Sequence, residues 1–531
     1  MSGADFLVLL PLICLGYGAV VVLLVGAFWR SHAVIVTLTL AALVACVLTS
    51  WQAVGLVPRQ VSPLLRLDVF ALAYLVLFAV GAIAVTAFSW EYLAGSARDK
   101  SRFYSLLLIS VAGMGLLASS GHFAAFLLGL ETLSVSLYGL IGFTLRRPQS
   151  LEASLKYLVL AGVSLSFLLM GMALIYFEFG TMEFSMLAAR LGASAAPPYL
   201  VLLGLGLVLV GFGFKLALVP FHSWAPDVYE GAPAPITALI ATGSKAAVLA
   251  LLVRFSALLM QGGGSLALLL TLLAIITMFG GNLLALLQGN LKRLLAYSSV
   301  AHMGYLLIPL LAGPAAGAAS VGCGSAATSP PAGGLVMPCG HDAIWFYLVC
   351  YFVASLGAFG VICALAADGR ELTELDQYRG LGFRRPLLGA ALGLMMLSLA
   401  GIPLTAGFMA KLYIFMAAAR SGLWLLLVVG LVNSGVAAYY YLRVLIAVYS
   451  PVEEPDPSWP RTRAASGLTL CVLSALVLIL GLLPGPLIRH AETTSRRATA
   501  GAAALQRPFS SDKGKELLSG LRRGAEGAQH R

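Results

Sequence analysis

The sequence predicts an all-α polytopic membrane protein that crosses the bilayer about fourteen times. Hydrophobic residues make up 60% of its 531 residues and charged residues only 10%, and the mean hydropathy is +0.94. Soluble domains carry about 25% charged residues, so this composition excludes an ordinary soluble fold. The hydrophobic residues lie in runs of about 20, the length of a helix that spans a bilayer, and Gly, Pro or charged residues separate the runs.

Each hydrophobic run is interpreted as one transmembrane helix. In chain order, we expect spans near residues 5–29, 33–54, 69–90, 103–119, 122–143, 153–177, 198–221, 233–256, 265–287, 293–313, 342–366, 387–415, 422–449 and 466–488. These spans divide the chain into spans one to three (1–102), a first unit of spans four to eight (103–258), a second unit of spans nine to thirteen (259–450), span fourteen (451–488) and a basic, flexible tail (489–531).

The distribution of Lys and Arg predicts the orientation of the chain. Loops after odd-numbered spans contain sixteen of these residues, and loops after even-numbered spans contain five. Because cytoplasmic loops are enriched in Lys and Arg, we expect the N-terminus to lie outside. The nine basic residues of the tail would then also lie outside, against this rule. A thirteen-span chain, which is the alternative, would place the tail inside.

The polar segments give few functional signals. The formal net charge is +11, but the basic residues are scattered through loops and the tail, so nucleic-acid binding is not expected. The loop 312–341 is rich in Ala, Gly, Ser and Pro and contains Cys323, Cys339 and His341. These three residues form either a disulfide or a weak metal site, or the two thiols stay unpaired, which is the more frequent case.

A short fragment occurs twice, in spans seven and twelve. GFGFKL (211–216) is followed by Pro220, and GFMAKL (407–412) is preceded by the interruption GIPLTAG (401–407). The two spans are five apart and therefore cross the membrane in opposite directions. Interrupted helices at corresponding places in two inverted halves are typical of transport sites. We therefore expect helices seven and twelve to be broken.

Five ionisable residues lie deep in apolar spans, where a charged lysine costs about 3 kcal/mol on insertion scales. They are Glu131, Lys215, Lys245, His302 and Lys411. If span five packs on span seven, Glu131 and Lys215 would form an ion pair, and making or breaking it would change how strongly the lysine holds its proton. All five are candidates for proton transfer, with His302 as a candidate relay near neutral pH.

Structural roles stay open for these residues. Glu131 and Lys215 would alternatively form a static buried salt bridge that fixes helix packing. Snorkelling to an interface is the alternative for Lys245, although it lies too deep in its span to escape easily. His302 would be a hydrogen-bonded structural residue, and Lys411 would be an interfacial anchor.

The sequence contains no P-loop, no Rossmann glycine pattern, no haem-attachment motif and no iron–sulfur cysteine cluster. We therefore expect no cofactor and no metal in this chain, and no use of ATP, NADH or electrons by the chain alone. A proton pathway without its own energy source belongs either to an antiporter driven by another ion or to one part of a larger machine.

Four stretches carry a resemblance to a known family. The sequence closely resembles the antiporter-like membrane subunits of NADH-quinone oxidoreductase (respiratory complex I), and among them subunit N, whose pattern has a Lys in span twelve. The stretches are FKLALVPFHSWAPDVYEGAPAPITALIATGSKAA (214–247), GLETLSVSLYGL (129–140), GNLLALLQGNLKRLLAYSSVAHMGYLL (281–307) and GIPLTAGFMAKLYIF (401–415).

The resemblance implies inverted repeats in spans four to eight and nine to thirteen. It implies that Glu131 and Lys215 are the coupling pair, Lys245 the central relay and Lys411 the terminal proton-carrying group of a non-redox translocase subunit without independent catalytic activity. It also implies subunits K and M as neighbours in the cell's inner (plasma) membrane, with NADH and quinone bound by other subunits. The loop 312–341 and the tail after residue 488 depart from the family's pattern.

We therefore predict a proton-translocating membrane-arm subunit that is coupled to quinone reduction elsewhere. Subunits of multi-subunit cation/proton antiporters and of membrane-bound hydrogenases share this fold and are the alternative within transport. A structural membrane scaffold, in which the buried charges only fix helix packing, is the alternative outside transport.

Overall fold

A computed structural model of the chain describes residues 3–95, 99–144, 147–194, 196–313, 340–366, 371–451 and 464–486. Most of these residues are helical, and the only strands in these ranges are the short antiparallel pair β1 (Arg59–Gln60) and β2 (Arg66–Leu67). The predicted all-α fold is therefore confirmed. Most of the predicted loop, including Cys323 and Cys339, and nearly all of the predicted tail lie outside the described residues.

The N-terminal spans and the first predicted unit form the helices up to α11. They are α1 (Gly3–Phe28), α2 (His32–Ala53), α3 (Val69–Tyr92), α4 (Lys100–Ser119), α5 (Phe123–Ile141), α6 (Pro148–Phe179), α7 (Phe184–Ala193), α8 (Tyr199–Leu216), α9 (Trp224–Gly231), α10 (Ala234–Leu239) and α11 (Lys245–Gln261).

The remaining helices form the second predicted unit and the last span. They are α12 (Gly264–Leu286), α13 (Leu291–Leu311), α14 (Gly340–Leu365), α15 (Leu381–Arg384), α16 (Pro386–Ala400), α17 (Ala406–Arg420), α18 (Trp424–Tyr449) and α19 (Ala464–Leu482), with 3₁₀ turns at Val54–Leu56 and Leu375–Tyr378. The limits of the units predicted from the sequence stay a prediction.

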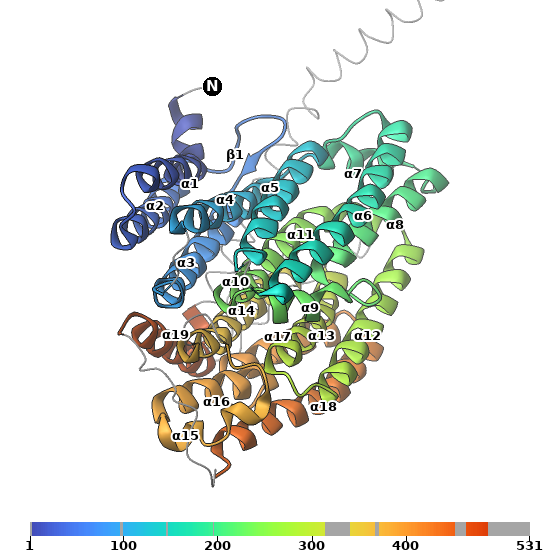
Figure 1. The fold of residues 1–531 in the computed structure, drawn as a ribbon. Helices are drawn as coiled ribbons and strands as arrows, with labels where there is room; N and C mark the ends of the chain where they lie inside the picture. The colour runs from blue at the N-terminus through green and yellow to red at the C-terminus, as the bar shows by residue number, and fades with distance from the viewer. Residues whose placement is uncertain are drawn as a thin grey trace, which may run out of the picture.

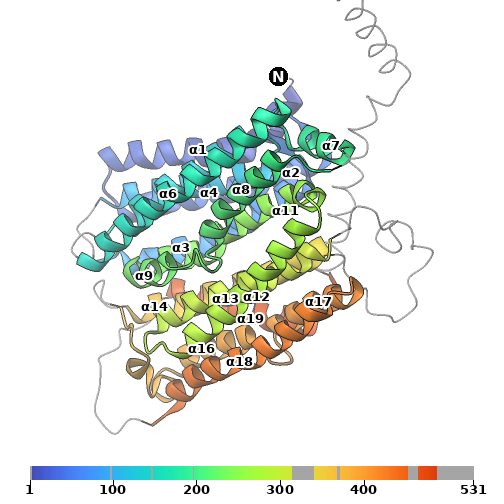
Figure 2. The same ribbon diagram turned by 90° about the vertical axis from the view of Figure 1, so that its right-hand side faces the viewer.

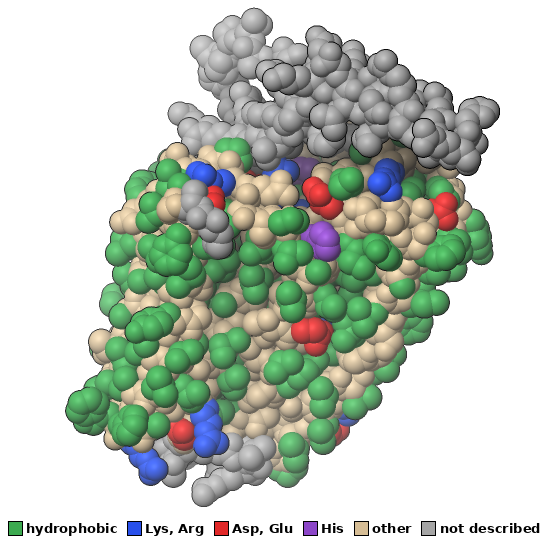
Figure 3. Space-filling view, turned by 90° about the horizontal axis from the view of Figure 1, so that it is seen from above, with side chains coloured by type: hydrophobic (Ala, Val, Ile, Leu, Met, Phe, Trp, Pro, Cys, Tyr) green, Lys and Arg blue, Asp and Glu red, His purple; other side chains and the backbone are tan. Residues whose placement is uncertain are grey.

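The long helices pack side by side in one bundle (Figures 1 and 2). α1 and α2 lie at one end of the bundle and α18 at the other, while the most deeply buried spans are α10–α11 and α14. Hydrophobic side chains cover most of the face in Figure 3, and most of its charged side chains lie near two opposite edges. This is the distribution expected of a protein whose middle contacts lipid.

Thirteen helices of the described chain are long and apolar enough to cross a membrane. They match every predicted span except span twelve (387–415), which consists of two 15-residue helices, α16 and α17. A helix of this length reaches only about 22 Å, less than the hydrocarbon core of about 30 Å. Counted as one broken crossing, α16 and α17 bring the total to the predicted fourteen.

Both predicted helix breaks occur, each at a residue with a left-handed backbone. α8 ends at Leu216, and Ala217 (φ 57°, ψ 44°) turns the chain away before α9 begins. α16 ends at Ala400, and Gly401 (φ 85°, ψ 41°) opens the break before α17. A left-handed residue commonly ends a helix in this way. Carbonyl groups at these helix ends, such as those of Phe214 and Ala400, also accept hydrogen bonds from side chains.

The helix that carries Lys245 contains a π-helical turn that the sequence analysis did not predict. The turn, Ile240–Ser244, joins α10 directly to α11, which begins at Lys245. Such turns disturb the regular backbone hydrogen bonds and are frequent at functional sites. In this turn the carbonyl of Ala241 accepts a hydrogen bond from the Tyr351 hydroxyl (3.1 Å).

Candidate functional site

The three lysines predicted to lie within the membrane are buried in the bundle. Lys215 is 6% exposed, Lys245 1% and Lys411 5%. Within the described chain these lysines form no ion pair, and each ammonium is bound by neutral hydroxyl or carbonyl oxygens. Burial penalises the charged form of a lysine, and neutral oxygens compensate only in part. The charge of each lysine therefore depends strongly on its neighbours.

Lys215 lies in the last turn of α8 and contacts α5. Its Nζ donates to Ser134 Oγ (2.7 Å), and the Ser134 hydroxyl donates to the carbonyl of Leu130 (2.6 Å). The ring of Tyr157 lies 5.2 Å from the ammonium. Spans five and seven are therefore in contact at Lys215, as the predicted pairing requires.

Glu131 lies one helical turn before Ser134 on α5 and is half-buried. It interacts electrostatically with Lys215, but the expected direct ion pair is not formed in this structure, because the lysine binds Ser134 instead. Residues three apart on a helix lie about 5–6 Å from each other. Lys215 thus has a neutral acceptor and an acidic acceptor within one turn, and here it uses the neutral one.

Lys245 is the centre of a cluster of hydroxyl groups. Its Nζ donates to Ser299 Oγ (2.7 Å), which also accepts from the hydroxyl of Tyr351 (2.8 Å) and lies 3.2 Å from that of Tyr229. These four side chains come from α11, α13, α14 and α9. The sequence analysis found only the lysine. Ser299 lies three residues before His302, and this helical spacing is the sequence signal that would have identified it.

His302 occupies the next turn of α13 and is hydrogen-bonded on both ring nitrogens. Nδ1 lies 2.5 Å from the Tyr347 hydroxyl and Nε2 lies 3.1 Å from the Tyr441 hydroxyl. Tyr441 also contacts the hydroxyl of Ser298. These contacts suit either a structural histidine or a relay.

Lys411 binds the end of the half-helix α16. Its Nζ donates to the carbonyl of Ala400 (2.7 Å) and to Ser434 Oγ of α18 (3.0 Å). A Cβ atom on Gly401 would lie only 2.8 Å from Lys411 Cδ, so only glycine leaves room for the lysine. The ring of Tyr305 lies 5.5 Å from the ammonium. Lys411 is therefore buried at the break between α16 and α17.

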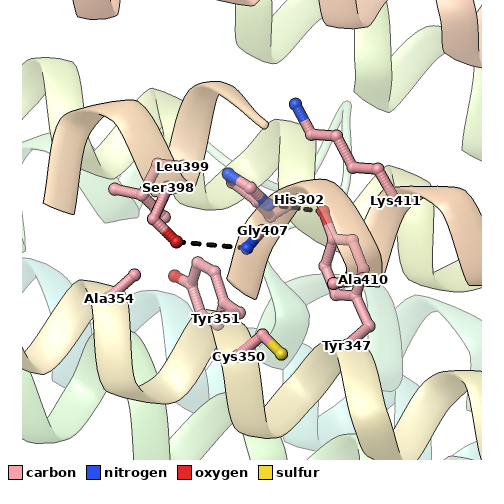
Figure 4. A pocket seen from close by; sticks show the side chains of 10 residues that line it. All are labelled: His302, Tyr347, Cys350, Tyr351, Ala354, Ser398, Leu399, Gly407, Ala410 and Lys411. Carbon is pink, nitrogen blue, oxygen red and sulfur yellow. Dashed lines mark hydrogen bonds between the residues drawn. The ribbon is translucent and has the colours of Figure 1, made fainter. Parts of the chain in front are cut away.

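A cavity separates Lys411 from the cluster around Lys245 (Figure 4). It is small and is lined by His302, Tyr347, Cys350, Tyr351, Ala354, Ser398, Leu399, Gly407, Ala410 and Lys411. Tyr351 also donates to Ser299, so the hydroxyl cluster of Lys245 reaches the cavity that Lys411 lines. The Lys411 ammonium itself binds Ala400 and Ser434. The cavity is small and its surface is mostly apolar, so a proton that passes between Tyr351 and Lys411 needs a movement of side chains or the entry of water.

The three lysines define an axis that runs from Lys215 through Lys245 to Lys411. Its first half contains fewer connecting contacts than its second half. No hydrogen bond among the described residues joins the Lys215–Ser134 contact to the hydroxyl cluster of Lys245. A proton that moves between Lys215 and Lys245 therefore needs water or a movement of side chains. The candidate residues therefore fall into a group at Lys215 and a hydroxyl cluster at Lys245, whose Tyr351 lines the same cavity as Lys411.

Asp227 and Glu230, on α9, lie in an ionic cluster. Asp227 pairs with Lys156 and Arg293, each at 2.9 Å, and Glu230 pairs with Arg293 at 2.8 Å. Partial burial favours the neutral form of Asp227, but hydrogen bonds and charges from Lys156 and Arg293 outweigh it and lower the pKa of this carboxyl. The cluster links α6 and α9 to α13.

A second buried ion pair was missed by the sequence analysis, which treated Lys292 as a loop charge. Lys292 Nζ lies 2.8 Å from Glu371 Oε2, and both side chains are fully buried. Burial favours the neutral form of Glu371, but the charge and hydrogen bond of Lys292, with hydrogen bonds from Tyr92 and the Ala234 amide, lower the pKa of this carboxyl below its usual value. Within the described chain, Lys292 thus has a counter-ion, whereas Lys215, Lys245 and Lys411 have none.

Metal binding finds no support in the described chain, where no group of three or more His, Cys, Asp or Glu side chains is placed to hold an ion. Cys323 and Cys339 lie outside the described residues, so the predicted alternatives for them stay open.

Comparison with known proteins identifies the family. A family model described as NADH:quinone oxidoreductase/Mrp antiporter, TM, matches residues 120–324 and 334–437. NADH-quinone oxidoreductase subunit N of Ectopseudomonas mendocina is 42% identical over 92% of this chain and 96% of its own length. Subunit N of Methylococcus capsulatus is 42% identical over 90% of this chain and 93% of its own length.

Solved structures agree with this result. A chain of respiratory complex I from Thermus thermophilus with bound aureothin is 35% identical, with a TM-score of 0.73 over 90% of this chain and 98% of that chain. A chain of the Mrp complex from Dietzia sp. is 22% identical, with a TM-score of 0.76 over 93% of this chain and 97% of that chain, and shows the shared fold. The chain belongs to the NADH-quinone oxidoreductase subunit N family.

Proposed function

We propose that this chain moves protons along the axis Glu131, Lys215, Lys245 and Lys411 in the membrane arm of NADH-quinone oxidoreductase. The observation that carries the proposal is that all three lysines are buried and form no ion pair with any residue that the structure describes. Lys292, by contrast, is buried with Glu371. A fixed packing charge needs such a partner, whereas a lysine bound by neutral oxygens gains or loses its proton as nearby charges change.

In this proposal each residue has a distinct role. Lys215 exchanges between Ser134 and Glu131, and the approach of the acidic group increases its hold on a proton. Lys245 passes its proton to Ser299, and Ser299 releases its own hydroxyl proton to Tyr351 when the Tyr351 hydroxyl donates to the Ala241 carbonyl instead. Tyr351 passes a proton on to the cavity, and Lys411 is the terminal carrier. His302 lines the same cavity and serves as a relay.

The energy comes from quinone reduction in other subunits, because this chain would hold no redox cofactor and have no catalytic activity alone. Subunits K and M would be its neighbours in the cell's inner membrane, with the N-terminus outside. The half-buried carboxylate of Glu131 is consistent with a coupling role toward a neighbour. An antiporter role is less favoured, because the subunit N relatives are 42% identical over nearly the whole chain, against 22% for the Mrp chain.

The test is proton pumping by the purified, assembled complex carrying Lys215→Ala, Lys245→Ala, Lys411→Ala or Glu131→Ala. The matched control is Lys100→Ala, because Lys100 lies at the start of α4, away from the axis, and contacts His32 and the carbonyl of Ala94. We expect each axis variant to assemble but to lose most pumping and coupled quinone reduction, while the control stays normal. Normal pumping in the assembled axis variants would instead favour a structural scaffold.

A further inference from the structure

The Lys292–Glu371 pair lies where four segments of the chain meet. Among the ion pairs of the described residues, it is the only one whose two side chains are both fully buried. Glu371 Oε1 also accepts from the hydroxyl of Tyr92 at the end of α3 (2.6 Å). Its segment is fixed to the start of α13, because the Leu291 amide donates to the carbonyl of Thr373 (2.7 Å). The pair therefore has a defined position.

Lys292 and Glu371 bind the two sides of the connection between α9 and α10. Lys292 Nζ donates to the carbonyls of Glu230 (3.0 Å) and Ala232 (2.6 Å), at the end of α9. Glu371 accepts a hydrogen bond from the backbone amide of Ala234 (2.8 Å), the first residue of α10. A cation at the C-terminal end of one helix and an anion at the N-terminal end of the next both complement the helix dipoles. The pair thus fixes how α9 leads into the helix of Lys245.

The same helices supply the hydroxyl cluster of Lys245. Tyr229 comes from α9, Lys245 from α11 and Ser299 from α13, which begins next to Lys292. Tyr351 comes from α14, and the segment that follows α14 carries Glu371. Lys245 lies eleven residues after Ala234, about 16 Å along the helix. One ion pair therefore fastens the end of α9, the start of α10, which leads into α11, and the start of α13.

We propose that Glu371, paired with Lys292, is a positioning residue that sets the place of Lys245 against Ser299, Tyr351 and Tyr229. Glu371 does not carry the proton itself. The inference rests on the proposed function, because it assigns to the pair the alignment of a proton-carrying lysine.

Two variants test the proposal without leaving a single buried charge, which would be strongly destabilising. The double variant Glu371→Gln with Lys292→Met removes both charges together. Ala234→Pro keeps both charges, but it removes the amide donor and places the proline ring against Glu371 Oε1, so it displaces the carboxylate from the start of α10. Proline is well tolerated at the first position of a helix, and the extended backbone of Pro233 (ψ 135°) suits a following proline.

The measurement is proton pumping per assembled complex, together with its pH profile. Because a displacement of about 1 Å at a reacting group can cost as much as a hundredfold, we expect a drop of about tenfold in the double variant. Ala234→Pro should lose several-fold, and both variants should show a displaced pH profile. Wild-type pumping with a wild-type profile in either assembled variant would overturn the proposal.

Asp68→Asn is the matched control for a general loss of stability. Asp68 forms a buried, two-pronged ion pair with Arg254 of α11 (2.6 and 3.1 Å), but it does not contact the joint between α9 and α10. This variant should lower the yield of complex and leave the pH profile unchanged; a displaced profile would show that the readout is not specific and would overturn the inference. If Lys245→Ala itself pumps normally, the proposed function fails; if only the Glu371 and Ala234 variants are normal, this inference alone fails.

Discussion

Spans seven and twelve carry the same fragment and are both broken, but they hold their lysines differently. In span seven, Lys215 precedes the break and donates to Ser134 on another helix. In span twelve, Lys411 follows the break and donates both to the carbonyl of Ala400, at the end of α16, and to Ser434. The first lysine has one neutral acceptor and the second has two.

The two breaks differ in which side chain binds a carbonyl group at the end of the preceding helix. At the end of α8 the carbonyl of Phe214 accepts both the Ala217 amide (3.0 Å) and the indole N–H of Trp224 (2.8 Å), so Lys215 is not needed there. At the end of α16 the lysine itself binds the carbonyl of Ala400, and a positive charge at a helix C-terminus is favourable. Lys411 is therefore part of the architecture of its break, whereas Lys215 can exchange partners without opening its own.

The largest expected effect comes from filling the space beside Lys411. Gly401→Ala places a Cβ 2.8 Å from Lys411 Cδ and 3.2 Å from Nζ, and a non-glycine residue with this left-handed backbone costs about 1–2 kcal/mol. Proton pumping by the assembled complex should therefore fall about tenfold. The counterpart Ala217→Gly, at the break of span seven, should pump normally. Equal activity in the two variants would contradict the proposed difference between the breaks.

A smaller effect is expected from removing one hydroxyl beside each lysine. A hydrogen bond to a charged group contributes about 1.5–3 kcal/mol. Ser134→Ala removes the one side-chain hydrogen bond that Lys215 forms with the described residues. Ser434→Ala leaves the carbonyl of Ala400 in place. The pH profile of pumping should therefore shift more in Ser134→Ala than in Ser434→Ala. The reverse order would show that Lys411 is the more easily perturbed lysine.

The smallest expected effect comes from the ionic cluster of Asp227, which links α6 and α9 to α13. Asp227→Asn removes two partly exposed ion pairs, worth about 1 kcal/mol or less. The pKa of Asp227 is lowered in the folded chain, so its contribution is present above the ordinary aspartate pKa of about 3.9 and is lost as the pH falls through the lower folded value.

The melting temperature of the complex carrying Asp227→Asn should therefore lie slightly and constantly below wild type between about pH 8 and pH 5. A gap that widens on acidification across this range would contradict the assignment.

Much of the fold could be predicted from the sequence, because a helix that crosses lipid must be apolar and about 20 residues long. The span limits, the two breaks and the burial of the three lysines agree with expectation. The site was only partly predictable, because hydroxyl groups such as Ser134, Ser299 and Tyr351 are common in membrane helices, and only the packing of distant helices shows which ones meet a lysine. Lys292 was misread for the same reason, since its partner Glu371 lies 79 residues away.

The central claim is that Lys245 carries protons between the two broken spans. The most direct measurement is the number of protons pumped per electron by the purified complex, reconstituted in liposomes, with Lys245→Ala compared with Lys100→Ala. The account predicts a clear drop in this ratio for Lys245→Ala at normal assembly, and the wild-type ratio for Lys100→Ala. A wild-type ratio in assembled Lys245→Ala would contradict it.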